Sequence, residues 1–156
     1  LLEIEKCLIT GTYVDMANQT VKDAHLENGY ISGGKYENVH FENVVFDGAQ
    51  LQSTVFRNCA FINCKFINCE LSFTKFESCN LVACAMDSCV FSITNSLNCN
   101  YLSCSLTNMT FEQARFENTK FFDGMFDEGT KSFALNQECL VESCFRQEEL
   151  EETNRI

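Results

Sequence analysis

Several kinds of residue and segment are scarce or missing in this chain of 156 residues, and each shortage excludes something. There is no proline, so no residue lacks the backbone N–H that a β-ladder needs. No apolar stretch reaches the roughly 18 residues of a membrane span. Lysine and arginine total 11 against 22 aspartates and glutamates, and the net charge of −11 excludes nucleic-acid binding through a basic groove. The same charge is compatible with ordinary solubility, attraction of a basic partner, or mimicry of a nucleic-acid backbone.

What the chain does have is a period of five residues. From residue 26 to residue 126 every fifth position, here called the central position, is large and apolar except at Ser96. The series reads Leu26, Ile31, Tyr36, Phe41, Phe46, Leu51, Phe56, Phe61, Phe66, Leu71, Phe76, Leu81, Met86, Phe91, Ser96, Tyr101, Leu106, Phe111, Phe116, Phe121, Phe126. Two residues before each lies the small position, most often Cys, Thr, Gly, Ala or Val. This period is neither helical nor strand-like, so it indicates a repeat architecture.

With these two columns the chain resembles the pentapeptide-repeat proteins over about two thirds of its length. That resemblance implies an all-β fold, a right-handed quadrilateral β-helix in which residues 20 apart stack on neighbouring turns. The small positions agree, because Thr54, Thr74 and Thr94 fall on one side and the in-frame cysteines on the other three. We predict an N-terminal cap segment over 1–20, the β-helix over 21–129, and a C-terminal helix with an acidic tail over 130–156. The first residues are Leu1-Leu2 rather than Met, which suggests a domain taken from a longer chain.

Eight of the eleven cysteines occupy small positions, and we predict that they are buried free thiols: Cys59, Cys64, Cys69, Cys79, Cys84, Cys89, Cys99 and Cys104. Stacked side chains keep their Cβ atoms near the rung spacing of roughly 4.8 Å, whereas a disulfide prefers roughly 3.8 Å. A straight column also cannot surround a metal ion tetrahedrally. Cys7, Cys139 and Cys144 lie outside these columns, and a disulfide among the three remains an alternative.

Ser96 interrupts the central column between Phe76 and Phe116. We expect Leu97 to turn partly inward there, or a small cavity to form, so that Ser96→Leu is neutral or stabilising. Marked destabilisation would instead indicate a specific buried partner for the hydroxyl.

Nothing in the repeats suggests catalysis. His25 and His40 each precede a central residue and should point outward, and Gly33-Gly34 is too short for a phosphate-binding loop. No nucleophile, base and acid converge on one place, because inward positions are apolar. We therefore predict a non-enzymatic protein without catalytic residues, cofactor or metal.

The C-terminal segment allows two interpretations. Helical spacing predicts a helix of about 22 residues over 131–153, long enough to lie along the rod, from Phe133, Leu140, Val141, Cys144 and Phe145. Alternatively, one more irregular turn continues the repeat, since the small-residue frame persists at Gly129, Ala134, Cys139 and Cys144. Lys131 and Asn136 at central positions argue against that turn.

Two outward columns are candidate binding surfaces. An apolar stripe should run along one side, formed by Ile62, Val82, Leu102 and Phe122, and it would contact either a partner or the C-terminal segment. An interrupted acidic column should run along another side, formed by Glu27, Asp47, Asp87 and Asp127. An open sheet edge over Phe116–Asp127, including Phe116 and Phe121, is a third candidate, because an open edge can accept a partner's strand.

The sequence of some repeats, in Phe56–Cys69 and Lys35–Glu42, also resembles that of the large luminal loop of synaptic vesicle glycoprotein 2. That resemblance implies a glycosylated β-helix in the lumen of a vesicle, carried by a transporter-like membrane protein and usable as a receptor by clostridial neurotoxins. The acceptor sequons are Asn18-Gln19-Thr20 and Asn108-Met109-Thr110, with Asn18 and Asn108 as glycosylation sites. The alternative is a free-standing cytoplasmic protein of the same repeat family, either a scaffold or a DNA mimic that binds a topoisomerase through its acidic column.

Overall fold

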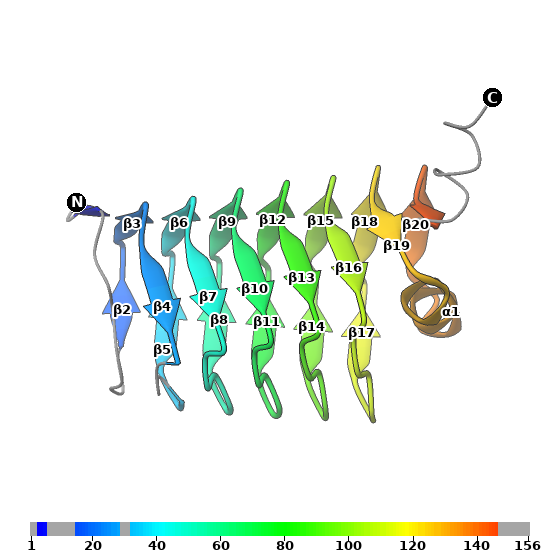
Figure 1. The fold of residues 1–156 in the computed structure, drawn as a ribbon, viewed down its shortest axis with the longest axis horizontal. Coiled ribbons are helices and arrows are strands. Elements are labelled where there is room, and N and C mark those ends of the chain that lie inside the picture. The colour runs from blue at the N-terminus through cyan, green and yellow to red at the C-terminus, as the bar shows by residue number, and fades with distance from the viewer. Residues whose placement is uncertain (1–2, 6–14, 29–31, 147–156) are drawn as a thin grey trace.

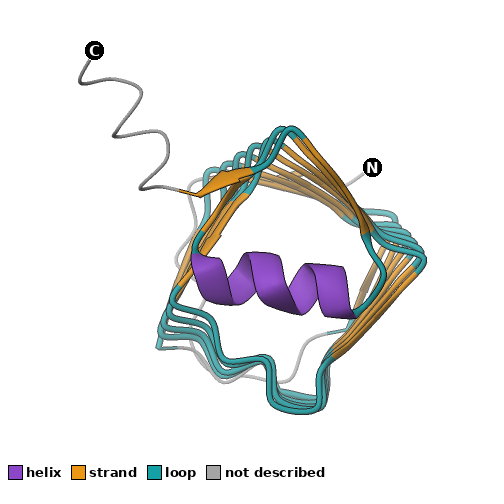
Figure 2. Cartoon of the chain, turned by 90° about the vertical axis from the view of Figure 1, so that its right-hand side faces the viewer, coloured by secondary structure: helices purple, strands orange, loops and turns teal. Residues whose placement is uncertain are grey.

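The structure is a computed structural model that describes residues 3–5, 15–28 and 32–146. The described chain winds as a solenoid of parallel strands, seen along the rod in Figure 1 and from its end in Figure 2. Among the strands from residue 16 onward, partners lie 20 residues apart, as Phe41 with Phe61 and Phe66 with Met86. The predicted all-β solenoid with four pentapeptides per turn is therefore confirmed.

Three of the four sides are sheets, here called A, B and C. Sheet A runs β1 (Glu3–Glu5), β3 (Thr20–Lys22), β6 (His40–Glu42), β9 (Ala60–Ile62), β12 (Asn80–Val82), β15 (Asn100–Leu102), β18 (Lys120–Phe122), β20 (Leu140–Glu142). Sheet B runs β4 (His25–Glu27), β7 (Val45–Asp47), β10 (Lys65–Ile67), β13 (Ala85–Asp87), β16 (Ser105–Thr107), β19 (Met125–Phe126), β21 (Phe145–Arg146). Sheet C runs β2 (Met16–Ala17), β5 (Lys35–Glu37), β8 (Val55–Arg57), β11 (Lys75–Glu77), β14 (Asn95–Leu97), β17 (Arg115–Glu117). Side D is held by single bridges, Gln50 to Glu70 to Val90 to Thr110.

The central residues fill the interior as stacked columns. The Phe46 and Phe66 rings lie 4.5 Å apart at an angle of 5°, and Phe41 lies 4.8 Å from Phe61. Phe56, Phe61 and Phe66 are fully buried. Five-residue spacing thus produces a continuous, mostly aromatic and aliphatic core, because each turn places its inward residue over the inward residue of the previous turn.

The side chains at the small positions also form hydrogen bonds between turns. The Thr74 hydroxyl donates to the Leu51 carbonyl at 2.7 Å, and the Cys69 thiol faces the Phe46 carbonyl at 3.1 Å in the same geometry. Each donor therefore reaches a carbonyl 23 residues earlier, on the turn below. The Leu51 carbonyl also accepts from the Thr54 N–H at 3.2 Å, so the hydroxyl is a second donor to it. Thr and Cys are equivalent at these positions because each supplies a side-chain donor to a buried carbonyl.

The eight in-frame cysteines are buried free thiols, as predicted. A hydrogen bond with Cys89 and burial both raise the pKa of the Cys69 thiol, and the corresponding bond with Cys84 and burial raise the pKa of Cys104. Cys139 and Cys144 are half-buried free thiols, so the structure shows no bridge between them. Cys7 lies outside the described residues.

The corners between sides require a left-handed backbone, with φ near +50° at position after position. Asn occupies many of these corners because its short amide tolerates this conformation better than most residues. The amides also form ladders from turn to turn, as in Asn38 to Asn18 at 2.9 Å and Asn118 to Asn98 at 2.8 Å. Phe73 and Ile93 are the large apolar exceptions, with φ of 61° and 52°.

The expectation for Ser96 was wrong. Ser96 is buried, and its Oγ lies 3.0 Å from the hydroxyl of Tyr101. Thr119 joins this cluster by donating to the Ser96 carbonyl at 3.0 Å. Leu97 stays on the outside of sheet C between Glu77 and Glu117. The serine therefore supplies both the room and the partner that a buried tyrosine hydroxyl needs.

The C-terminal segment is neither of the predicted alternatives alone. The helix α1 covers only Glu128–Asn136 and lies across the end of the rod, as Figure 2 shows. Its Phe133 ring stacks 4.1 Å from Phe111. After the helix, β20 and β21 add a further rung to sheets A and B. The 22-residue helix along the rod was wrong, because Leu140 and Val141 keep the five-residue frame and pair as a strand.

At the other end, β1 pairs with β3 and so extends sheet A, while most of the predicted cap segment lies outside the described residues. In the described part of the chain α1 is too short, at nine residues, to cross a membrane.

Candidate binding surface

The predicted apolar stripe exists on the outer face of sheet A. Ile62, Val82, Leu102 and Phe122 stack on successive strands, since each is the ladder partner of the next. Leu102 is 41% exposed and the other three are half-buried. The helix α1 packs on the end of the rod, so the described part of the C-terminal segment leaves this face uncovered (Figure 2).

The middle of this face carries no charge. The outward residues of β9, β12 and β15 are Ala60 and Ile62, Asn80 and Val82, Asn100 and Leu102. Asn100 donates to Asn80 at 3.0 Å, so the two amides are bonded to each other. Charged residues begin only at Glu42 on one side and Lys120 on the other. In a chain with 33 charged side chains, 11 basic and 22 acidic, such a face stands out as a surface suited to an apolar contact.

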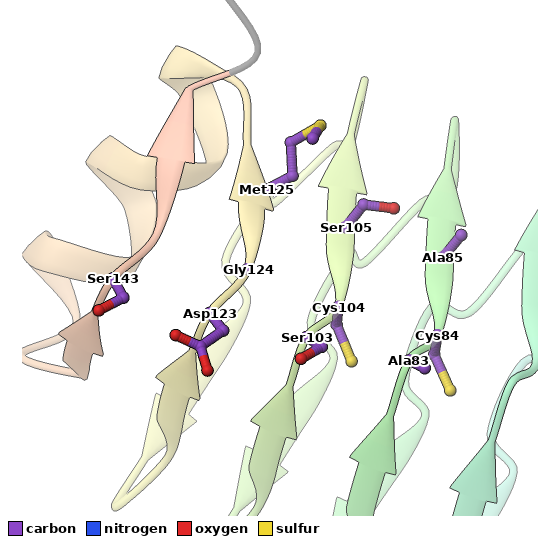
Figure 3. A pocket seen from close by; sticks show the side chains of 10 residues that line it. All are labelled: Ala83, Cys84, Ala85, Ser103, Cys104, Ser105, Asp123, Gly124, Met125 and Ser143. Atoms are coloured by element: carbon purple, nitrogen blue, oxygen red, sulfur yellow. The ribbon is translucent and has the colours of Figure 1, made fainter. Parts of the chain in front are cut away.

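A shallow groove of about 500 Å³ lies beside the stripe, where sheet A turns into sheet B (Figure 3). The corner residues are small at Ala83, Ser103 and Ser143, where Asn43 and Asn63 stand on earlier turns, and Asp123 adds one carboxylate between Ser103 and Ser143. Ala85 and Ser105 line the next strands. Gly124 completes the floor, since an added Cβ would lie 2.8 Å from the Cys104 carbonyl oxygen. Sequence reasoning missed the groove, although the change from Asn to Ala and Ser at this corner was its visible signal.

The acidic column also exists, on sheet B, but two of its members already have structural partners. Asp87 accepts from Asn108 at 2.9 Å and from Thr107 at 3.1 Å, and these hydrogen bonds hold its pKa below the usual value. Asp127 accepts from the backbone N–H groups of Thr130 at 2.9 Å and Asn108 at 2.7 Å. Part of the acidic column therefore has a structural role, because Asp127 caps α1 and Asp87 holds the corner at Asn108.

The structure covers the predicted edge at β18 and β19, whereas β17 is the last strand of sheet C. The side chains of Phe116 and Phe121 are buried, with exposures of 3% and 1%. Strand β18 is covered by β20, and the backbone N–H of Phe116 in β17 donates to Gln137 at 3.0 Å. Neither β18 nor β19 has an open edge facing the C-terminal end, because the repeat resumes after α1.

Both sequon asparagines, Asn18 and Asn108, are exposed and lie at left-handed corners. The Asn18 side chain accepts a hydrogen bond from Asn38, while the Asn108 amide donates to Asp87. Their glycosylation stays a prediction.

The two histidines lie on different sheets. His25 is 3.8 Å from Asp47 and His40 is 3.9 Å from Glu42, and all four side chains are half-exposed. Among the residues that the structure describes, no three His, Cys, Asp or Glu side chains are placed to hold a metal ion. The absence of catalysis stays a prediction.

Comparison with known proteins concerns the repeats and the fold. A family model of pentapeptide repeats, in eight copies, matches residues 45–82 and 54–92. The fold is similar to that of full-length QnrB1, a plasmid-mediated fluoroquinolone resistance protein, with 14% identity and a TM-score of 0.52 over 81% of this chain and 75% of that one. HetL from the cyanobacterium Nostoc, involved in heterocyst differentiation regulation, matches at 12% identity and TM-score 0.49 over 72% of this chain and 56% of that one. A search of curated proteins found no match.

These findings support the presence of pentapeptide repeats. They do not support the resemblance to the luminal loop of synaptic vesicle glycoprotein 2. Neither structural neighbour is the luminal loop of synaptic vesicle glycoprotein 2, so the vesicle location, the receptor role and the neurotoxin partner gain nothing from them. At 14% identity the likeness to QnrB1 concerns the fold alone. Pentapeptide repeats are matched over residues 45–92, and the four-sided parallel solenoid continues in the same five-residue frame on both sides of them.

Proposed function

We propose that this protein is a non-catalytic binding rod that contacts a protein partner through the outer face of sheet A. The observation that carries the proposal is the uncharged surface of β9, β12 and β15 with Leu102 exposed at its centre. Burying such a face against a partner removes apolar surface from water without stripping the solvent from any ionised group.

The shape of the surface indicates the kind of partner. The stripe runs parallel to the rod axis, because its members are ladder partners rather than neighbours along the chain. The groove at Ala83 and Ser103 runs beside it and offers room for side chains. A partner that presents a row of apolar side chains, such as an amphipathic helix or an extended segment, fits this arrangement.

The acidic column is a second candidate, for a partner with a DNA-binding surface such as a topoisomerase. It is favoured by Glu27 and Asp47, whose carboxylates occupy adjacent rungs of sheet B. It is weakened by the hydrocarbon side chain of Ile67 in the same column and by the structural hydrogen bonds of Asp87 and Asp127. We rank it below the apolar face. Fluoroquinolone resistance is a property of QnrB1 and is not carried over to this chain.

Two matched double variants test the proposal. Val82→Asp with Leu102→Asp places charge on the apolar face, whereas Glu27→Lys with Asp47→Lys reverses charge on the acidic face. Thermal melts should show that both fold. The full chain and both variants are then used as bait, with bound proteins quantified by mass spectrometry. We expect a protein that the full chain and the acidic-face variant retain and that the apolar-face variant loses. Loss on the acidic-face variant alone would favour the DNA-mimic function.

A further inference from the structure

The corner between side D and sheet C carries two exposed apolar side chains on adjacent turns. Phe73 is 60% exposed and Ile93 is 41% exposed. Their turns are neighbours, since Phe76 and Ser96 pair directly in sheet C. The same corner holds Ser53 on the turn before and Gln113 on the turn after. The apolar ridge, as we call Phe73 and Ile93, is therefore local to the middle of the rod.

The backbone makes these two residues unexpected. Both have a left-handed conformation, with φ of 61° at Phe73 and 52° at Ile93. A bulky or β-branched residue is a genuine outlier in this region, where Asn, Asp, Ser or Gly would fit at lower cost. Most other left-handed corners of the described chain do carry such residues. Strain of this kind, combined with exposure, points toward a role outside the fold's own packing.

The charge around the ridge differs from that of the whole molecule. The chain carries a net charge of −11, yet the outward residues of sheet C from β5 to β17 include more cations than carboxylates: Lys35, Arg57, Lys75 and Arg115 against Glu37, Glu77 and Glu117. Side D adds the carboxylates of Glu70 and Glu112, so that the two sides together are close to neutral. Val55 and Leu97 on sheet C and Val90 on side D add half-buried apolar surface. Two copies of this acidic chain can approach here with less repulsion than through sheet B.

We propose that the apolar ridge is the centre of a two-fold contact with a second copy of this chain, the two rods lying side by side and antiparallel. The two-fold axis passes between the turns of Phe73 and Ile93. Phe73 then meets Ile93 of the second copy, and sheet C of one copy faces sheet C of the other. A two-fold contact of this kind is self-complementary and closes at two copies.

The register follows from the charges. With the axis between those turns, Arg57 faces Glu117 of the second copy, Lys75 faces Asn95, and Glu77 faces Leu97. Moving the axis by half a turn places Glu77 opposite Glu77, which is repulsive. Arg57 already lies 3.2 Å from Glu77 and 3.9 Å from Glu37 in its own copy, and its side chain remains half-exposed for a further carboxylate.

The first test is sedimentation equilibrium of the full chain over a wide range of concentration. We expect a monomer–dimer equilibrium, and the double variant Phe73→Asn with Ile93→Asn should raise the dimer dissociation constant at least about tenfold. Asn suits a left-handed corner, so the variant monomer should melt no lower than the parent. Ala83→Asn, at the diagonally opposite corner between sheets A and B, is the matched control and should leave dimerisation unchanged.

The second test addresses the register. Arg57→Glu should weaken the dimer, and adding Glu117→Arg to the same chain should restore it, because the antiparallel contact pairs these two positions. A chain that stays monomeric at every concentration overturns the proposal. A dimer that survives both asparagine substitutions overturns it equally, and failure of the charge swap to restore the dimer overturns the antiparallel register.

Discussion

Position 96 shows how one residue can depart from a repeat for a reason that lies on another side of the coil. Tyr101 is fully buried in sheet A, and its hydroxyl needs a partner. Ser96, five residues earlier on sheet C, supplies that partner at 3.0 Å. A large residue at position 96 would fill the space that the hydroxyl occupies. Sequence reasoning compared Ser96 only with Phe76 and Phe116 in its own column, so the cross-column pair was missed.

Ser96→Leu should destabilise the protein. It leaves the Tyr101 hydroxyl buried without its partner, at about 1–3 kcal/mol, and crowds the core as well. The double variant Ser96→Leu with Tyr101→Phe should lose less unfolding free energy than the sum of the two single losses. It lacks the Tyr101 hydroxyl, which the leucine alone would leave unpaired and would crowd. Urea unfolding of the three variants and the parent measures this coupling. Simple additivity would show that the two side chains do not depend on each other.

The column thiols should be unreactive in the native protein. The thiolate is the reactive form, and burial of all eight thiols disfavours that charged form and keeps reagents away from them. We expect alkylation of the eight in-frame cysteines only after denaturation, as read by peptide mass spectrometry. Half-buried Cys139, whose pKa burial raises to about 11, should label slowly rather than never. Disulfides among the eight, or rapid native labelling, would contradict this account.

At the scale of elements, the five-residue frame predicted the strands but not the helix. From β2 to β20 every strand of sheets A, B and C has its central residue where the period places it, because the coil geometry requires one inward side chain per pentapeptide. Strand β1 is outside this frame, since Ile4 pairs with Val21. The spacing of Leu140, Val141 and Phe145 wrongly indicated a helix. These residues lie in strands, and a five-residue strand repeat with an extra apolar residue beside a central position produces similar spacing. Lys131 and Asn136 were the better indication of where the repeat stops. They are polar residues at central positions, and at these positions α1 takes the place of side D and sheet C.

Asp127 should decide whether α1 forms. Its carboxylate accepts from the N–H of Thr130 at 2.9 Å as the cap of the helix. Asp127→Ala should cost about 0.5–2 kcal/mol, the usual loss for such a cap. Asp47, in the same column, lies 3.8 Å from the half-exposed His25. Asp47→Ala should therefore change the free energy of unfolding by less than about 0.5 kcal/mol. Equal effects in denaturant unfolding would show that the cap does not stabilise the fold.

The same cap predicts a dependence on pH. Burial opposes ionisation of Asp127, but hydrogen bonds from Thr130 and Asn108 outweigh it and hold the pKa below the usual value. A lowered folded pKa contributes stability above the unfolded pKa of about 3.9, and that contribution is lost as the pH falls through the folded pKa. The stability difference between the parent and Asp127→Ala should therefore shrink in acid. A constant difference would exclude this linkage.

At the scale of the whole molecule, the sequence predicted the rod and its faces but not the use of each face. The stripe of Ile62, Val82, Leu102 and Phe122 could be read from a period of 20, because outward positions follow the same register as inward ones. The groove beside it could not, since it arises from small residues of two sheets that meet only in three dimensions. Nor does a rod with four different faces identify its partner from pattern alone.

The most direct test of the central claim is a comparison of photo-crosslinking at two positions on the full chain. A photoreactive amino acid replaces Leu102 on sheet A or Asp47 on sheet B, and the folded variants are irradiated in the presence of cell extract. We expect a discrete protein adduct from position 102, absent at position 47 and lost when Val82→Asp is added. A discrete adduct from position 47 with none from position 102 would contradict the claim that the protein binds its partner through the uncharged face.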